Sequence, residues 1–566
     1  MEKHWWKEAV IYQIYPRSFK DSNADGIGDL KGIISQLDYL QTLGVDVLWL
    51  SPIFASPNAD NGYDVSDYEA IMADFGTMQD FDELLAQVHK RHLKVILDLV
   101  VNHSSDEHRW FRQSRISKDN PYRDYYIWQP PRNGQPPNDW ISFFSGSAWE
   151  FDPNTEEYYL HLFLKKQPDL NWENPRLRQE IYQMMRFWLD KGVDGFRMDV
   201  IPFLSKDTSF PPYPQGRFGD LSLYANGPRI HEFLHEMNSE VLQHYDCLTV
   251  GEGFGVSAEQ ANLYVGRSRQ ELQMIYHFDH AVPREEHRFL QPAAELSLVE
   301  LKAIFDRWDE AIGQEGWQNI YFGNHDNPRV LSRFGHTGTH REASAKMLAT
   351  LLLTLRGTPT IYQGDELGMT NCPFASVEEF DDVQVKNAYQ ALIVDTNRSH
   401  LTDTFLAAAN RIARDHARTP MPWDDSAHAG FTTATQPWLK VNPNFTTINA
   451  KEAISRPDSI YHYYRQMLHL RKQHSVLVYG DYQNLTPQNP HVWAFVRNVE
   501  NESVIVICHF SSEERFFSIP NFINLQQRLI GNYQTTIIRG NELQLQPYEA
   551  AVWKVKSAQD NEQDSA

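Results

Sequence analysis

Acidic side chains follow short apolar runs at several points of the chain, and one run also carries a guanidinium. The stretch 195–201 places Arg197 and Asp199 two residues apart, and Glu252 and Asp326 follow later apolar runs. Residues two apart on a strand point to the same face, so Arg197 and Asp199 should lie side by side. A buried carboxylate beside a fixed positive charge stays ionised at neutral pH, as a nucleophile must. The alternative for this short motif is a structural ion pair.

Asp199, Glu252 and Asp326 suggest chemistry on a glycosidic bond if they meet at one site. Retaining hydrolysis of such a bond requires two carboxyl groups on either side of it. One attacks as a carboxylate, and the other, kept protonated by its neighbours, donates a proton to the leaving oxygen.

The acids would be positioned by strands that alternate with amphipathic segments such as 30–43 and 81–92. This alternation implies parallel strands with right-handed crossovers, and eight such units predict an α/β fold, a (β/α)8 TIM barrel with its active site at the carboxyl ends of the strands. The eight strand-like runs are Ala9–Ile14, Val45–Leu50, Val95–Val101, Gly195–Val200, Cys247–Gly251, Met274–Phe278, Asn319–Phe322 and Thr358–Tyr362.

Two stretches interrupt this alternation. Residues 102–172 are rich in Pro, Asn, Asp and aromatics and are too long for a simple loop, which predicts an excursion subdomain after strand 3. Beyond Gly480, short alternating runs predict a C-terminal antiparallel β-sandwich. The predicted division is barrel 1–103 and 173–479, excursion subdomain 104–172, β-sandwich 480–556 and a disordered tail 557–566.

Bulk composition narrows the class of partner. The net charge of −22 argues against nucleic acid or an anionic membrane and fits a small neutral substrate. Three widely spaced cysteines predict free thiols in a reducing compartment. No apolar stretch is long enough for a signal peptide or a membrane span, so a cytoplasmic protein is expected. The oligomeric state stays open, with a monomer favoured.

Four motifs together resemble the signature regions of the α-amylase superfamily of glycoside hydrolases, in the same order. They are Asp98-Leu-Val-Val-Asn-His103, Gly195-Phe-Arg-Met-Asp-Val200, Gly251-Glu252 and Asn324-His-Asp326. The resemblance is strongest to the oligo-1,6-glucosidase group, whose other stretches are similar to Gln167-Pro-Asp-Leu-Asn171 and Ala417-Arg-Thr-Pro-Met-Pro-Trp423. Pro422 and Asp365 depart from that group's pattern.

The resemblance implies that Asp199 is the nucleophile, Glu252 the acid/base and Asp326 a stabiliser that grips sugar hydroxyls. It also implies that Asp60, with Tyr63, binds substrate by closing the pocket behind the non-reducing glucose. Asp60 would pair with an arginine, for which Arg414 is the first candidate and Arg411 and Arg418 are alternatives. The remaining substrate-binding residues that it implies are His103, Arg197, Val200 and His325, with Phe144, Phe163 and Gln167 at the pocket entrance. For the aromatic residues, plain packing is the alternative.

A separate loop, 21–29, has oxygen-bearing residues at alternate positions with Gly26 sixth, as in an EF-hand, but it lacks the Glu at position twelve. The resemblance implies a structural Ca²⁺ and no organic cofactor. Its ligands would be Asp21, Asn23, Asp25 and Asp29 with the carbonyl of Ile27. The alternative is an Asx-rich turn that caps a helix.

The function expected from the resemblance is a retaining, exo-acting α-glucosidase that removes terminal, preferably α-1,6-linked, glucose from short oligosaccharides such as isomaltose. Val200 after the nucleophile is typical of the α-1,6 side. Alternatives are a dextran glucosidase, an α-1,4-glucosidase, and relatives directed to sucrose or trehalose 6-phosphate. Sucrose isomerases carry a charged loop that is missing after Asn327. A trehalose 6-phosphate hydrolase should place basic residues at the acceptor site, and Lys206 and Arg217 are the only ones in 201–219. A non-enzymatic transporter subunit would need a membrane anchor.

Overall fold

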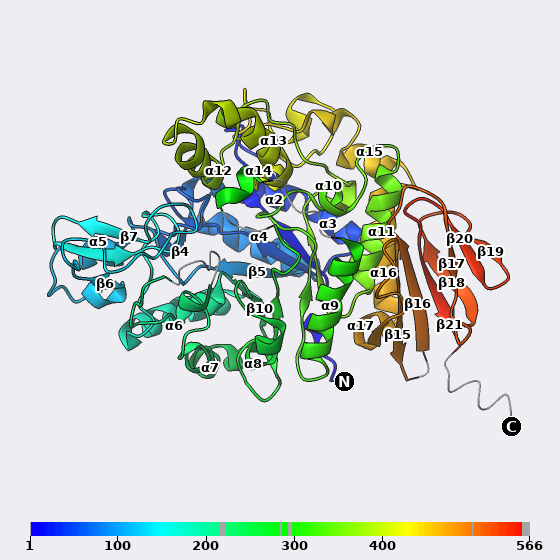
Figure 1. The fold of residues 1–566 in the computed structure, drawn as a ribbon, viewed down its shortest axis with the longest axis horizontal. Coiled ribbons are helices and arrows are strands. Elements are labelled where there is room, and N and C mark those ends of the chain that lie inside the picture. The colour runs from blue at the N-terminus through cyan, green and yellow to red at the C-terminus, as the bar shows by residue number, and fades with distance from the viewer. Residues whose placement is uncertain (1, 214–220, 283–285, 292–296, 501, 557–566) are drawn as a thin grey trace.

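The structure is a computed structural model that describes residues 2–213, 221–282, 286–291, 297–500 and 502–556. The predicted disordered tail, 557–566, and Arg217 lie outside these residues. Along its long axis the molecule has three parts: the excursion at one end, a central barrel, and two antiparallel sheets at the other end (Figure 1).

The central sheet contains eight parallel strands in the order β11-β10-β9-β5-β2-β1-β13-β12. A parallel bridge from Ile275 to Gln318 joins its two outer strands and closes the barrel. Every predicted run overlaps one of these strands, so the predicted barrel is confirmed. The strands are β1 (Ile11–Ile14), β2 (Val47–Leu50), β5 (Lys94–Leu99), β9 (Gly195–Met198), β10 (Leu248–Glu252), β11 (Met274–Tyr276), β12 (Asn319–Ile320) and β13 (Thr358–Tyr362).

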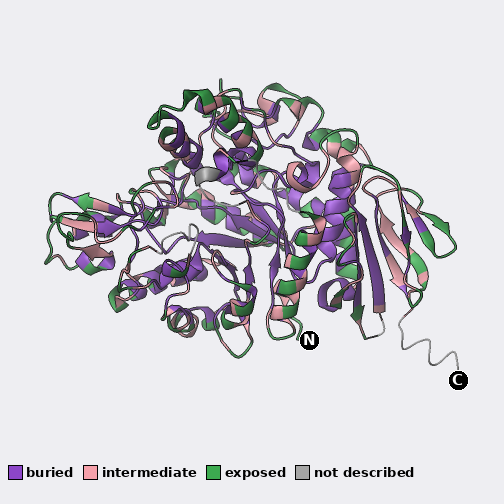
Figure 2. Ribbon diagram, viewed as in Figure 1, coloured by how far each residue is buried: buried purple, intermediate pink, exposed green. Residues whose placement is uncertain are grey.

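Helices surround the barrel and bury their apolar faces against it (Figure 2). Their ends follow local capping rules: the N-cap of α4 is Thr77, whose side chain forms a capping box with that of Asp80, and the C-cap of α6 is Gly192 in the left-handed conformation. The predicted segment 30–43 forms two helices, broken at Gln36. The bounds are α2 (Leu30–Ser35), α3 (Leu37–Leu43), α4 (Met78–Lys90), α6 (Pro175–Lys191), α7 (Ile230–Glu240), α9 (Leu298–Ile312), α11 (Arg341–Thr354) and α16 (Ile460–Gln473).

The excursion between β5 and α6 has a small antiparallel sheet of its own. Its strands β6 (Trp128–Gln129), β8 (Glu157–Leu160) and β7 (Trp149–Asp152) lie in that order. The helix α5 (Arg109–Ser114) packs beside them (Figure 1). A bridge from His103 to Asp169 ties the end of the excursion to the segment after β5, and a bridge from Tyr126 to Leu170 lies within the excursion.

Two antiparallel sheets follow the barrel and share one apolar layer, which confirms the predicted sandwich. Val492 and Ile505 of the larger sheet and Phe517 and Leu543 of the smaller sheet belong to this layer. The alternating runs that predict the sandwich, His491–Val496, Ser503–His509, Thr535–Ile538 and Ala550–Val555, overlap four of its eight strands, and the other four (Asp481–Asn484, Arg515–Ser518, Leu525–Gly531 and Glu542–Leu545) were missed. The sheets are β14 (Asp481–Asn484), β15 (Val492–Val499), β16 (Glu502–His509), β21 (Ala550–Val555) and β18 (Leu525–Gly531), then β17 (Arg515–Ser518), β20 (Glu542–Leu545) and β19 (Ile537–Arg539).

Two further sequence expectations concern thiols and membranes. Cys247, Cys372 and Cys508 are buried and form no disulfide, as predicted. None of the helices in the described part of the chain combines the length and the apolar character needed to cross a bilayer.

Candidate active site

Arg197, in the middle of β9, is the centre of a buried cluster of acids at one end of the barrel. Its Nη1 donates to Asp98 Oδ1 at 2.6 Å and to Asp199 Oδ1 at 2.7 Å, and its Nη2 lies 2.8 Å from Glu252 Oε2. Its Nε and Nη2 also donate to the hydroxyl of Tyr276. One guanidinium therefore orients carboxylates from β5, β9 and β10, the geometry predicted for Arg197 and Asp199.

The charge state of Asp199 reflects two opposing effects. Burial raises the pKa of its carboxyl to about 6, and Arg197 limits the rise. Asp199 also accepts a side-chain hydrogen bond from Glu252, which lowers its pKa. Because its pKa lies near 6, Asp199 is mostly ionised at neutral pH. Burial acts more strongly on Asp199 than the sequence argument assumed.

The backbone changes direction directly after Asp199. The sequence predicted a strand through Val200, but β9 ends at Met198 and Val200 has φ 35° and ψ 43°. This left-handed conformation is rare for a β-branched residue and costs about 1–3 kcal/mol. It aims the N–H of Val200 at Glu252 Oε2, 2.7 Å away. The prediction was wrong because residue type favoured a strand while the site requires a turn.

Asp326 and Asp60 lie on the opposite side of the site, around Arg414. Arg414 Nη1 donates to Asp326 Oδ1 at 3.3 Å, and Arg414 Nη2 lies 3.6 Å from Asp60 Oδ1. Arg418 donates to the same Asp326 oxygen at 3.1 Å, and Arg411 is exposed. Of the three candidate arginines, Arg414 is thus the one that the structure places beside Asp60.

Aromatic and imidazole rings form the back of the site. Tyr63 donates to Asp98 Oδ2 at 3.0 Å, and its ring stacks on that of His325. Burial lowers the pKa of His103 to about 4 and that of His325 to about 3, so both imidazoles are neutral hydrogen-bonding groups at pH 7. Gln167, expected at the entrance, is instead fully buried behind this wall, where its Nε2 contacts Asp60 and His103.

These groups enclose a narrow pocket in which polar side chains face two phenylalanine rings. The guanidinium of Arg414 lies over the ring of Phe144, 5.2 Å from its centroid, which fixes that ring at the pocket wall. A sugar offers both hydroxyl groups and apolar C–H faces, and such a lining suits both. The lining residues are Asp60, Tyr63, His103, Phe144, Phe163, Asp199, Val200, Asp326 and Arg414.

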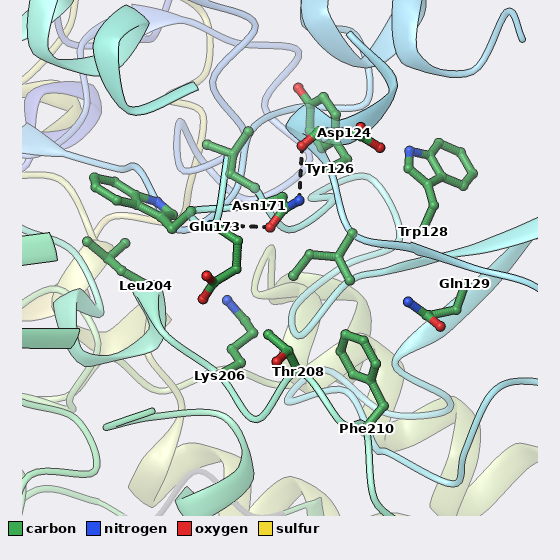
Figure 3. A pocket seen from close by; sticks show the side chains of 13 residues that line it. Asp124, Tyr126, Trp128, Gln129, Asn171, Glu173, Leu204, Lys206, Thr208 and Phe210 are labelled. Carbon is green, nitrogen blue, oxygen red and sulfur yellow. Dashed lines mark hydrogen bonds between the residues drawn. The ribbon is translucent and has the colours of Figure 1, made fainter. Parts of the chain in front are cut away.

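A second and wider cavity, of about 270 Å³, lies between the excursion and the segment after β9 (Figure 3). Trp128, Asn171, Lys206 and Phe210 are among its lining residues, and Asp199, Glu252 and Asp326 are not. Lys206 bonds to the carboxylate of Asp169 and is almost fully buried. The candidate chemistry therefore belongs to the narrow pocket.

The sequence of the chain matches the family model described as "Alpha amylase, catalytic domain" over residues 13–480. The chain belongs to the α-amylase family. A second model, "Alpha-amylase SusG C-terminal domain", matches residues 492–552. The family of glycoside hydrolases expected from the four motifs is thus confirmed.

Within the α-amylase family, the similar relatives cover the chain almost completely. The oligo-1,6-glucosidase of Bacillus cereus is 52% identical over 98% of this chain and 100% of its own length. That of Parageobacillus thermoglucosidasius is 51% identical with the same coverage. Among solved structures, isomaltulose synthase SmuA from Protaminobacter rubrum has a TM-score of 0.95 at 44% identity, covering 98% of this chain and 100% of that one.

The loop 21–29 of this α-amylase family chain is a series of Asx turns. Asp21 Oδ1 accepts from the N–H of Asn23, Asn23 Oδ1 from that of Asp25, and Asp25 Oδ1 from that of Ile27. Asp29 caps α2 by accepting from Gly32 N at 2.7 Å. The side-chain atoms that could bind a metal are all oxygens, which suit Ca²⁺. Each of these oxygens accepts a hydrogen bond and still has a second lone pair. The atom types thus suit a calcium ion, but no group of three or more Asp, Glu, His or Cys side chains in the described part of the chain is placed to hold a metal ion, and the helix-capping role of Asp29 is present.

Sequence reasoning missed two buried residues that organise the site. Tyr276, the last residue of β11, accepts from Arg197, and its position at a strand end was the available signal. Asp382 accepts hydrogen bonds from Nε and Nη2 of Arg414, and no sequence motif surrounds Asp382 that could have identified it.

Proposed function

We propose that this protein is a retaining, exo-acting α-glucosidase that hydrolyses terminal, preferably α-1,6-linked, glucose in short oligosaccharides such as isomaltose. The observation that carries the proposal is the arrangement of Asp199 and Glu252. They hydrogen-bond to each other and share Arg197, and Asp199 lines a narrow pocket. Two neighbouring carboxyl groups, one to attack and one to donate a proton, are what retaining hydrolysis requires.

The mechanism follows from these two roles. Asp199 attacks the anomeric carbon while Glu252 donates its proton to the leaving glycosidic oxygen, so a glucosyl ester of Asp199 forms and the acceptor sugar leaves. Glu252, now a carboxylate, takes a proton from water, which attacks the same carbon and releases α-glucose and free Asp199. Asp326 is held by Arg414 and Arg418 and would accept hydrogen bonds from sugar hydroxyls. These hydrogen bonds would strengthen in the transition state.

The α-1,6 preference is supported by the oligo-1,6-glucosidases that resemble this chain over its whole length. Lys206 gives no support to a trehalose 6-phosphate substrate, because it pairs with Asp169 and its positive charge is already matched. Val200 lines the pocket beside Asp199 and supports discrimination between linkages.

Hydrolysis rates on isomaltose, maltose, sucrose, panose, dextran and trehalose 6-phosphate test the proposal. We expect the highest kcat/KM on isomaltose and panose, with α-glucose as the first-formed anomer in NMR spectra. A preference for maltose or sucrose would contradict the linkage, and β-glucose as first product would contradict retention.

We further propose that the loop of Asp21, Asn23, Asp25, Ile27 and Asp29 binds a structural Ca²⁺, supported by its all-oxygen donor set. An ion bound only to the native state stabilises it by mass action, so exhaustive chelation should lower Tm and added Ca²⁺ should restore it. An unchanged melting curve after chelation, with no metal in elemental analysis, would reject the site.

Location, assembly and domain boundaries stay predictions. The three free, buried thiols support a reducing compartment such as the cytoplasm. Cell fractionation tests the location, and sedimentation velocity tests the expected monomer. Limited proteolysis tests the boundaries near residues 103, 172 and 479.

A further inference from the structure

Asp382 is a fully buried carboxylate that does not line the catalytic pocket yet holds a side chain that does. Its Oδ1 accepts from Arg414 Nη2 at 2.6 Å and from Arg414 Nε at 3.0 Å. The N–H of Gln384 donates to the same oxygen, because Asp382 is the N-cap of α12 (Val383–Tyr389). Burial raises the pKa of Asp382, but the charges of Arg414 and Arg418 and the hydrogen bonds from Arg414 and the N–H of Gln384 together outweigh it and lower the pKa to about 2.

The guanidinium of Arg414 is shared unequally among three carboxylates. Its Nη2 lies 2.6 Å from Asp382 and 3.6 Å from Asp60, and its Nη1 lies 3.3 Å from Asp326. The Nη2 is thus bonded to the carboxylate outside the pocket and held just beyond hydrogen-bond distance of the one inside it.

Asp60 shows the consequence of this unequal sharing. Its Oδ1 is buried and accepts no hydrogen bond within the described chain, and Arg414 Nη2 is the cation beside it. Leaving a buried acceptor unpaired costs about 1–3 kcal/mol, so such an atom calls for an explanation. Without Asp382, a small movement of Nη2 would satisfy this oxygen and bring the guanidinium further into the pocket.

We propose that Asp382 is a positioning residue that holds Arg414 back from Asp60, so that Asp60 Oδ1 keeps its capacity to accept a hydroxyl of the terminal sugar. The proposal rests on the function proposed above, because it takes the narrow pocket as the sugar site. It predicts that losing the charge of Asp382 lets Arg414 close onto Asp60 and weakens binding of the terminal glucose without moving Asp199 or Glu252.

Asp382→Asn and Asp382→Ser test this, since both residues can cap α12 and neither carries the charge. We expect KM for isomaltose and the inhibition constant of glucose to rise together by about tenfold or more, with a smaller change in kcat, because a hydroxyl contact made in both ground and transition states acts mainly on KM. Asp381→Asn, which removes the same charge from the neighbouring, partly exposed position, is the matched control and should behave as wild type.

A double-mutant cycle separates this role from plain stabilisation. In an Asp60→Asn background the second change, Asp382→Asn, should raise the glucose inhibition constant little further, because its target is already lost. Additive effects, or a lower Tm with an unmoved glucose inhibition constant, would overturn the proposal. If isomaltose is not hydrolysed by the wild type, the proposed function fails, whereas glucose binding still reports on Asp382.

The wild-type complex with glucose provides a test that needs no variant to fold. A crystal structure should show a glucose hydroxyl at Asp60 Oδ1 with Arg414 still bonded to Asp382. Arg414 displaced onto Asp60 in that complex, or Asp60 Oδ1 without a sugar contact, would overturn the proposal.

Discussion

Replacing Glu252 by Gln removes the proton donor and changes little else in the site. Arg197 Nη2 and the N–H of Val200 both contact the same oxygen, Oε2, so a glutamine whose carbonyl takes that position keeps both contacts. Glu252 is 1% exposed, and the two side chains have the same shape, so Tm should change little.

The loss of activity should depend on the leaving group. General acid catalysis contributes about 10²–10⁴-fold, which corresponds to about 3–5 kcal/mol of barrier. Glu252→Gln should therefore lower kcat/KM for isomaltose by about 10²-fold or more. It should lower kcat/KM for α-glucosyl fluoride far less, because fluoride leaves without a proton from the enzyme.

The assay compares kcat/KM for the two substrates in wild type and variant, together with thermal unfolding. Glu259→Gln is the control and should match the wild type, because Glu259 is exposed in the short 3-10 helix Ala258–Gln260 that follows β10. Isomaltose activity within tenfold of wild type, or equal losses on both substrates, would refute the role of Glu252.

Three further predictions concern the same cluster. Because Asp199 attacks as a carboxylate and burial raises its pKa to about 6, kcat/KM for isomaltose should fall as the pH drops through about 6, and a profile that stays flat well below that pH would contradict the assignment. Val200→Ala should reduce the preference for isomaltose over maltose by a factor worth about 1–3 kcal/mol. An unchanged ratio of the two kcat/KM values would show that Val200 does not determine the linkage preference. Arg197→Lys should lower both turnover and Tm, because one ammonium cannot reproduce the contacts of a buried guanidinium with three carboxylates, and a variant with wild-type melting would be inconsistent with this.

The strands of the barrel could be predicted because each is a continuous apolar run bounded by polar residues. The strands that were missed in the C-terminal sheets are partly exposed: Asp481–Asn484 is mostly polar, and Arg515–Ser518 has two adjacent Phe residues in place of an alternating run. Edge strands of this kind are defined by their pairing partner rather than by their own sequence.

The site was predicted where a motif and a strand end coincide, as at Asp199 and Glu252. The turn at Val200 could not be predicted, because a β-branched residue after an apolar run favours a strand and only the tertiary structure imposes φ 35°. Asp382 could not be predicted for a different reason: its partner Arg414 is 32 residues away, and nothing in either local sequence pairs them.

The central claim is that Asp199 forms a covalent bond to glucose and Glu252 completes the turnover. In Glu252→Gln treated with α-glucosyl fluoride, the glucosyl-enzyme should form readily and break down slowly, because activation of water now lacks its base. Mass spectrometry of the protease-digested variant should find one added hexosyl group on the peptide that contains Asp199. A hexosyl group on any other residue, or fluoride release with no trapped ester and β-glucose as the product, would contradict the account.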